Sequence, residues 1–190
     1  MMEKTLLDVD DSLGEFLKPL NNYYNETRGT DFCFEDYWTY SLHEIWECSE
    51  GEAADVIHEF YKTLSFERMK PLKFSQEALR MLRLKREFIA VSYRPEMLVD
   101  LTREWIADTF FGMETLCVGS YDFSGPVETK LSICKRLGVD SLVEDNAKTA
   151  SECAGAGITA VVLSKPWNIN VSYNGFRRVS DWNAVPEFLD

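Results

Sequence analysis

Hydrophobic positions divide the chain into short apolar runs and longer amphipathic stretches. The short runs lack a polar residue at every second position, which is typical of strands buried on both faces of a parallel sheet. In the second half of the chain such runs alternate with helical segments, as in α/β proteins. The runs predict strands at residues 5–7, 88–91, 116–118, 141–143 and 158–163. We therefore predict a doubly wound α/β core with a parallel sheet.

Amphipathic segments with apolar residues three and four positions apart predict the helices. Gly29 and Gly138 each follow such a segment and favour a helix end there, and Pro95 stands where another helix begins. The predicted helices lie at about residues 16–28, 50–64, 76–86, 97–106, 130–137 and 146–155. A last short helix is predicted to be capped by Asp181.

A helical stretch at about residues 15–75 separates the first strand from the second. It includes a capping box at Ser49 and Glu52 and a group of aromatic residues at 32–46. Because this stretch is too long for a single crossover connection, we predict an inserted helical cap. Residues 1–14 and 76–190 would then form the α/β core.

Composition limits the partners of the protein. The chain has 20 lysines and arginines against 32 aspartates and glutamates, a formal net charge of −12, and no run of five basic residues. Nucleic-acid polymers and anionic membranes would be repelled by such a surface. No apolar stretch approaches the length of a membrane span. A small phosphorylated ligand stays compatible with this charge because a metal ion can neutralise it locally. The oligomeric state is left open.

The five cysteines indicate the compartment. Their number is odd, no C-x-x-C pair occurs, and the N-terminal residues do not resemble a signal peptide. We expect reduced thiols in a cytoplasmic protein.

Polar residues follow three of the predicted strands. Asp8-Val9-Asp10 follows the first, Ser92-Tyr93-Arg94 the second, and Glu144-Asp145 the fourth. Ligands of open parallel sheets bind beyond the carboxyl ends of the strands, so these residues are the candidate site. Acidic strand ends on one edge suit a hard cation with oxygen ligands, such as magnesium.

These side chains can divide the chemistry of phosphate-ester cleavage. Asp8 and Asp10 lie two residues apart and project to one side of an extended chain. One carboxylate can attack phosphorus while the other protonates the leaving oxygen and later activates water. Lys130 can offset the phosphate charge, and Ser92 precedes a helix N-terminus that can bind an anion. Arg94 can grip the substrate or pair with an acid.

The segments LLDVDDSL, FIAVSYRP and SLVEDN, with Lys130 before the last, resemble the four motifs of the haloacid dehalogenase superfamily. The resemblance covers nearly the whole chain, and the pattern D-x-D-x-[TSV] matches Asp8, Asp10 and Ser12. It implies Asp8 as the nucleophile and Asp10 as the acid and base. Lys135 is a second candidate for the lysine of the third motif.

The resemblance also implies a magnesium ion held by Asp8, the backbone carbonyl of Asp10 and the acidic pair Glu144 and Asp145. The position of the insert is similar to the first cap type of the superfamily. Within that group the sequence most resembles the 5′-nucleotidase, or deoxyribonucleotidase-like, branch.

The expected function is a magnesium-dependent phosphohydrolase that cleaves a small phosphate monoester through an aspartyl-phosphate intermediate. A nucleoside monophosphate is one candidate substrate. A sugar phosphomutase on the same scaffold and a non-catalytic binding or regulatory protein are the alternatives. The expected phosphate and substrate contacts are Ser12, Ser92, Tyr93, Arg94, Trp38 and Trp46.

The cap aromatics have two interpretations. Trp38, Tyr40 or Trp46 can stack on a flat ring of the substrate, or they can form the core of the cap. Glu35 and Asp36 are expected to disfavour substrates with additional negative charge.

Overall fold

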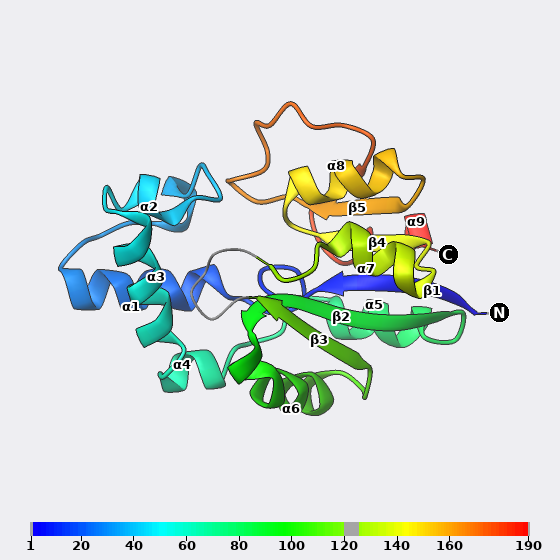
Figure 1. Ribbon diagram of the computed structural model, residues 1–190, viewed down its shortest axis with the longest axis horizontal. Coiled ribbons are helices and arrows are strands. Elements are labelled where there is room, and N and C mark those ends of the chain that lie inside the picture. The colour runs from blue at the N-terminus through cyan, green and yellow to red at the C-terminus, as the bar shows by residue number, and fades with distance from the viewer. Residues whose placement is uncertain (1, 120–125, 190) are drawn as a thin grey trace.

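The computed structural model describes residues 2–119 and 126–189 and has an α/β architecture (Figure 1). Six strands form one parallel sheet in the order β3-β2-β1-β4-β5-β6, which confirms the predicted fold class. The strands are β1 (Glu3–Asp8), β2 (Arg86–Pro95), β3 (Glu114–Gly119), β4 (Ser141–Glu144), β5 (Thr159–Leu163) and β6 (Arg177–Val179).

Helices account for most of the remaining regular structure. The cap segment contains α1 (Leu17–Arg28), the 3₁₀ helix η1 (Phe34–Asp36), α2 (Leu42–Ile45), α3 (Glu50–Phe60) and α4 (Leu64–Glu67). The core contains α5 (Ser75–Leu82), the 3₁₀ helix η2 (Glu96–Leu98), α6 (Val99–Thr109), α7 (Lys130–Leu137), α8 (Ala147–Gly155) and α9 (Pro186–Leu189).

The central strand β1 is buried on both faces, which explains its unbroken apolar run. Leu6 packs with Ile89 and with Ile133 of α7 on one face. Leu7 packs on the other face with Leu79 of α5 and with Leu189, the last residue of α9. Because neighbouring side chains of a strand point to opposite faces, two consecutive leucines serve two helical layers.

Most residues of a second hydrophobic cluster belong to the cap segment. Leu20, Tyr37 and Phe60 are fully buried in it, and Leu98 and Trp167 of the core pack against it. The two connections to the core run side by side, since Glu15 N donates to Lys70 O and Leu72 N donates to Leu13 O, both at 2.8 Å. Helix α5 begins at Ser75 and packs against the sheet, and the division into core and cap stays a prediction.

Three local predictions need correction. The helix expected to reach Arg86 ends at Leu82, and Arg86 instead begins β2. The sixth strand, Arg177–Val179, was not predicted because only its last residue is apolar and buried. Asp181 accepts a hydrogen bond from Asn183 N within a turn, so it does not cap α9, which begins at Pro186.

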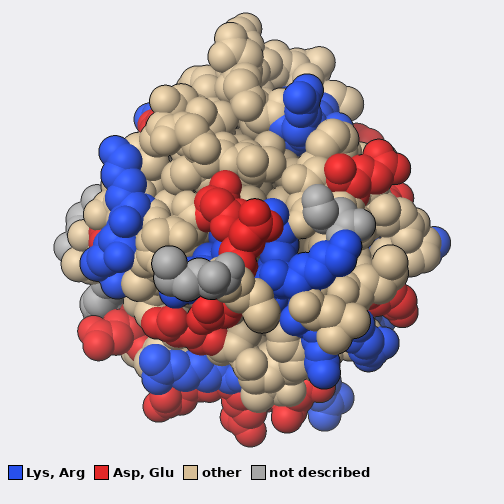
Figure 2. Space-filling model, turned by 90° about the vertical axis from the view of Figure 1, so that its right-hand side faces the viewer, with Lys and Arg blue, Asp and Glu red and all other residues tan. Residues whose placement is uncertain are grey.

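Charges of both signs lie close together on the face away from the cap (Figure 2). At this end of the sheet Arg86 pairs with Glu3 at 2.8 Å and with Asp140 at 2.6 Å. Lysines and arginines on this face therefore lie next to acidic side chains. Among the described residues, no helix combines the length and hydropathy needed to cross a bilayer.

An irregularity between β2 and β3 positions the residues that follow Ser92. The pairing shifts between Ser92 and Pro95, and Pro95 pairs with Gly119. A Cβ on Gly119 would lie 1.7 Å from the backbone oxygen of Tyr93, so only glycine fits beside this bulge.

We predict that Gly119→Ala lowers the free energy of unfolding by about 1–3 kcal/mol, because the added methyl group must displace the backbone at Tyr93. Chemical denaturation measures the change. Gly112→Ala is the matched control, since a Cβ there meets nothing within 4 Å. Equal stability of the two variants would contradict the close approach.

Candidate active site

The carboxyl ends of β1, β2 and β4 lie side by side in the sheet and face the cap (Figure 1). Asp8 ends β1, Ser92 lies near the end of β2, and Glu144 ends β4. The strand order therefore brings together residues that are far apart in the sequence. The predicted gathering of these polar strand ends on one edge is present in the structure.

Lys130 lies between two of the carboxylates. It is the first residue of α7, is 3% exposed, and donates to Asp8 Oδ1 and to Glu144 Oε2, the latter at 2.6 Å. Burial opposes its charge, but the carboxylates of Asp8 and Glu144 raise the pKa of Lys130, so it remains a cation. Lys135 is exposed in the last turn of α7, so the geometry favours Lys130 as the lysine of the site.

Three buried carboxylates form a group that fits a divalent cation. One oxygen each from Asp8, Glu144 and Asp145 lies within 4.8 Å of the others. Asp145 Oδ2 accepts a hydrogen bond from Trp167 Nε1 at 2.8 Å, whereas its buried Oδ1 has no hydrogen-bond partner in the described part of the chain. An unpartnered carboxylate oxygen in an all-oxygen set is what a magnesium ligand requires.

The electrostatics of this group agree with a cation site. Burial, followed by the charges of Asp8 and Glu144, raises the pKa of Asp145 well above its usual value. Burial and Glu144 also raise the pKa of Asp8, against the opposing effect of Lys130. Three carboxylates share one buried lysine, and a bound divalent ion would compensate the excess negative charge. The residues present therefore fit magnesium.

Asp10 is held by Arg94. The Arg94 Nη2 donates to Asp10 Oδ1 at 2.6 Å, and Nε lies 3.1 Å from Oδ2. Ser92 Oγ donates to Asp10 Oδ2 at 3.2 Å and accepts from Arg94 N at 3.1 Å. Of the two roles considered for Arg94, the structure has the pairing with an acid. Asp10 keeps 24% of its side chain exposed, so it still reaches the cavity beside it.

Two other predicted contacts differ in their access to this cavity. Tyr93 lines it, accepts a hydrogen bond from Lys130 N at 3.2 Å, and has its ring centroid 4.9 Å from Lys130 Nζ. Ser12 is fully buried, and its backbone oxygen accepts from Trp182 Nε1 at 2.7 Å. Ser12 supports the loop after β1 from behind and does not line the cavity.

The predicted stacking residues separate into three environments. Trp46 is 5% exposed, stacks on Tyr24 at 4.1 Å, and donates to Tyr37 OH at 3.1 Å, so it belongs to the core of the cap. Trp38 is 63% exposed and lines a neighbouring hollow of about 520 Å³. Tyr40 lines both this hollow and the cavity at Asp10.

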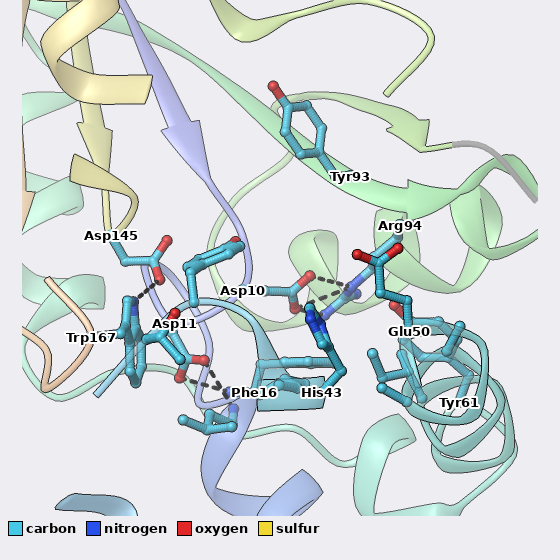
Figure 3. A pocket seen from close by; sticks show the side chains of 17 residues that line it. Asp10, Asp11, Phe16, His43, Glu50, Tyr61, Tyr93, Arg94, Asp145 and Trp167 are labelled. Carbon is cyan, nitrogen blue, oxygen red and sulfur yellow. Dashed lines mark hydrogen bonds and ion pairs between the residues drawn. The ribbon is translucent and has the colours of Figure 1, made fainter. Parts of the chain in front are cut away.

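The cavity at Asp10 has a volume of about 370 Å³ and lies between cap and sheet (Figure 3). Asp10, Arg94 and Asp145 border it on the sheet side. The cap side is formed by residues of α1, α2 and α3 and by Tyr40 and Tyr61. A polar reacting end and a mainly apolar opposite wall are typical of a small-molecule site.

Sequence reasoning missed two residues that shape this site. Asp11 has φ 56° and accepts hydrogen bonds from Phe16 N and Leu17 N, at 3.2 and 2.9 Å, so it satisfies the start of α1. Burial raises the pKa of Asp11 to about 6. Trp167 orients Asp145 and lines both hollows. Asp11 is a capping residue type ahead of a helix, whereas nothing in the local sequence marks Trp167.

The fold is that of haloacid dehalogenase-like proteins. A haloacid dehalogenase-like hydrolase from Streptococcus pneumoniae superposes with a TM-score of 0.72 at 10% identity, over 100% of this chain and 99% of that one. A protein from Haemophilus somnus named as a predicted phosphoglycolate phosphatase gives 0.66 at 12% identity, over 100% and 98%. CbbY from Rhodobacter sphaeroides, in complex with phosphate, gives 0.62 at 16% identity, over 96% and 95%. No family model and no curated protein matches the sequence.

We predict that Asp145→Asn abolishes stabilisation of the protein by magnesium. At 100 times its dissociation constant, magnesium should add about 2.7 kcal/mol to the unmodified protein. In chelator the variant should be at least as stable as the unmodified protein, because it removes a buried charge and keeps an oxygen for Trp167. Thermal melts with magnesium and with chelator measure both effects. An equal magnesium shift in the two proteins would rule out Asp145 as a ligand.

The same melts have an expected pH dependence. The pKa values of Asp8 and Asp145 are raised above the ordinary value of 3.8, so the folded metal-free protein binds protons that the unfolded chain releases. Stability in chelator should therefore fall as the pH rises above about 4. The stability of the Asp145→Asn variant should fall less steeply over that pH range. A metal-free stability that rises towards pH 8 would contradict the raised pKa values.

Proposed function

We propose that the protein is a magnesium-dependent phosphohydrolase that cleaves small phosphate monoesters through an aspartyl phosphate on Asp8. The observation that carries the proposal is the buried arrangement of Asp8, Lys130 and the acidic pair Glu144 and Asp145, with Asp10 beside it at the cavity. A carboxylate nucleophile, a fixed cation and a separate acid are what this chemistry requires. The phosphatase named among the similar folds supports the same reaction class.

In the first step Asp8 attacks the phosphorus of the ester. Lys130 binds Oδ1 of Asp8, so we assign Oδ2 as the attacking oxygen. The new Asp8–phosphorus bond forms as the bond from phosphorus to the leaving oxygen breaks. For this step Asp10 must first take up a proton, which it then donates to the leaving oxygen. In the structure Arg94 and Ser92 donate to its carboxylate and fix its position.

In the second step Asp10, now ionised, takes a proton from a water molecule that attacks phosphorus. Cleavage of the aspartyl phosphate restores Asp8 and releases inorganic phosphate. Magnesium, held by Asp8, Asp145 and the backbone carbonyl of Asp10, with Glu144 beside them, would offset the charge of the phosphoryl oxygens. Lys130 supplies the fixed positive charge of the chain itself.

A nucleoside monophosphate stays a candidate substrate within this proposal. Tyr40 and Trp167 line the cavity and are the aromatic residues against which a base would stack, whereas the buried Trp46 does not line it. The size of the cavity, about 370 Å³, suits a compact leaving group.

We predict that Asp8→Asn lowers magnesium-dependent phosphate release by at least about 10³-fold while the protein stays folded. The amide is nearly isosteric but is a poor nucleophile. Phosphate release from p-nitrophenyl phosphate measures activity, and circular dichroism checks the fold. A folded variant with near-normal turnover would exclude Asp8 as the nucleophile.

Asp10→Asn should show a dependence on the leaving group. An alkyl phosphate needs a proton on its leaving oxygen, so its turnover should fall by about 10²–10⁴-fold. Turnover of p-nitrophenyl phosphate, whose leaving group is stable without a proton, should fall less in the phosphorylation step. Asp100→Asn, at an exposed position of α6, is the control for a change of charge. Equal losses for both esters in single-turnover measurements would exclude Asp10 as the acid.

A further inference from the structure

One face of α3 borders the cavity. Glu50, Ala53, Ala54, Ile57 and Tyr61 all line it, at spacings of three and four residues. Small and apolar residues form the middle of this stripe, and a carboxylate stands at its beginning. In Figure 3, Glu50 projects from the cap towards the space between cap and sheet. The wall opposite the reacting groups therefore carries a negative charge.

Glu50 is not needed to cap its own helix. Ser49 Oγ accepts from Glu52 N, and Glu52 Oε2 accepts from Ser49 N at 2.9 Å, which completes the capping box without Glu50. Among the described residues no hydrogen bond or ion pair joins Glu50 to another side chain. Its carboxylate is thus available to a ligand in the cavity.

Among the described residues of the cavity wall, the basic side chains are Arg94 and His43, and neither has a hydrogen bond or ion pair to Glu50. Arg94 is the one lysine or arginine among the lining residues, and it is already bound to Asp10. Glu35 and Asp36, expected to repel anions, do not line the cavity, and Glu50 takes that place.

Aromatic rings complete the surroundings of the leaving group. Tyr40, Tyr61 and Trp167 line the same cavity, and aromatic rings attract cations. Lys165 Nζ already lies 6.0 Å from the centroid of the Trp167 ring. A carboxylate and several rings around an otherwise apolar space are the features that recognise an alkylammonium group. A carboxylate or a second phosphate would instead meet Glu50 without a partner.

We propose that the cavity selects phosphate monoesters of amino alcohols, whose positively charged leaving group is bound beside Glu50 in a cavity lined by aromatic residues. This inference rests on the proposed function and narrows its substrate class. It predicts that esters with cationic leaving groups bind more tightly than esters with neutral ones, such as nucleosides. Esters with anionic leaving groups should bind most weakly.

The test compares phosphocholine with 3,3-dimethylbutyl phosphate, which has the same shape but carries a carbon in place of the charged nitrogen. Calorimetry measures the binding of each ester, in magnesium, to the Asp8→Asn protein, which cannot turn them over. Phosphocholine should bind about tenfold tighter than the neutral ester, and 2-phosphoglycolate should bind more weakly than both.

Glu50→Gln in the same background should reduce the preference for phosphocholine to about twofold and leave the neutral ester unchanged. Asp55→Asn removes a charge from the exposed side of the same helix, outside the cavity, and should preserve the tenfold preference. A loss of preference in both variants would assign the effect to the overall charge of the cap and overturn the role of Glu50.

The inference is overturned if phosphocholine and 3,3-dimethylbutyl phosphate bind equally. It is also overturned if 2-phosphoglycolate binds more tightly than phosphocholine, or if phosphocholine does not bind. The proposed function is judged separately, from magnesium-dependent turnover of p-nitrophenyl phosphate by the unmodified protein. If the protein turns over p-nitrophenyl phosphate but shows no preference for phosphocholine, the proposed substrate class is wrong. The phosphohydrolase proposal is then unaffected.

Discussion

The contact of Lys130 with Asp8 and Glu144 is the interaction on which the site depends. Three carboxylates at the buried ends of neighbouring strands repel one another, and burial adds to the cost of their charges. Lys130 is the buried cation among them, and it is the first residue of α7. The position of α7 on the sheet is thereby coupled to the charge state of Asp8 and Glu144.

The sequence was sufficient for the parts of the fold that depend on local pattern. Apolar strands such as β1 are buried on both faces, so their hydrophobicity is continuous and visible in the chain. Strand β6 carries two arginines and one buried valine, and its pairing with β5 depends on tertiary contacts that no local pattern reveals. The end of the helix at Leu82 was likewise misplaced, because the buried Arg86 looks like a helix terminus in sequence.

The candidate site could be predicted where chemistry and strand ends coincide. Asp8 directly follows an apolar run, Asp10 and Asp145 come within three residues of one, and parallel strands place such positions on one edge. Trp167 could not be found this way, because its role comes from a hydrogen bond to a residue 22 positions earlier. The cap aromatics were ambiguous for a related reason: Trp46 and Tyr40 have similar local surroundings, and only packing separates the buried ring from the one in the cavity.

The paired connections at the base of the cap make it a module. Leu13 and Leu72 are joined by a backbone hydrogen bond, so the chain leaves the core and returns to it at nearly the same point. A short turn between them would close the core without the cap, and an insert of different length would fit the same two ends. The reacting carboxylates and Lys130 all lie outside this insert, whereas Glu50 and Tyr61 lie within it. Under the proposed function, changes in the insert would alter the choice of substrate while the proposed reacting residues stay unchanged.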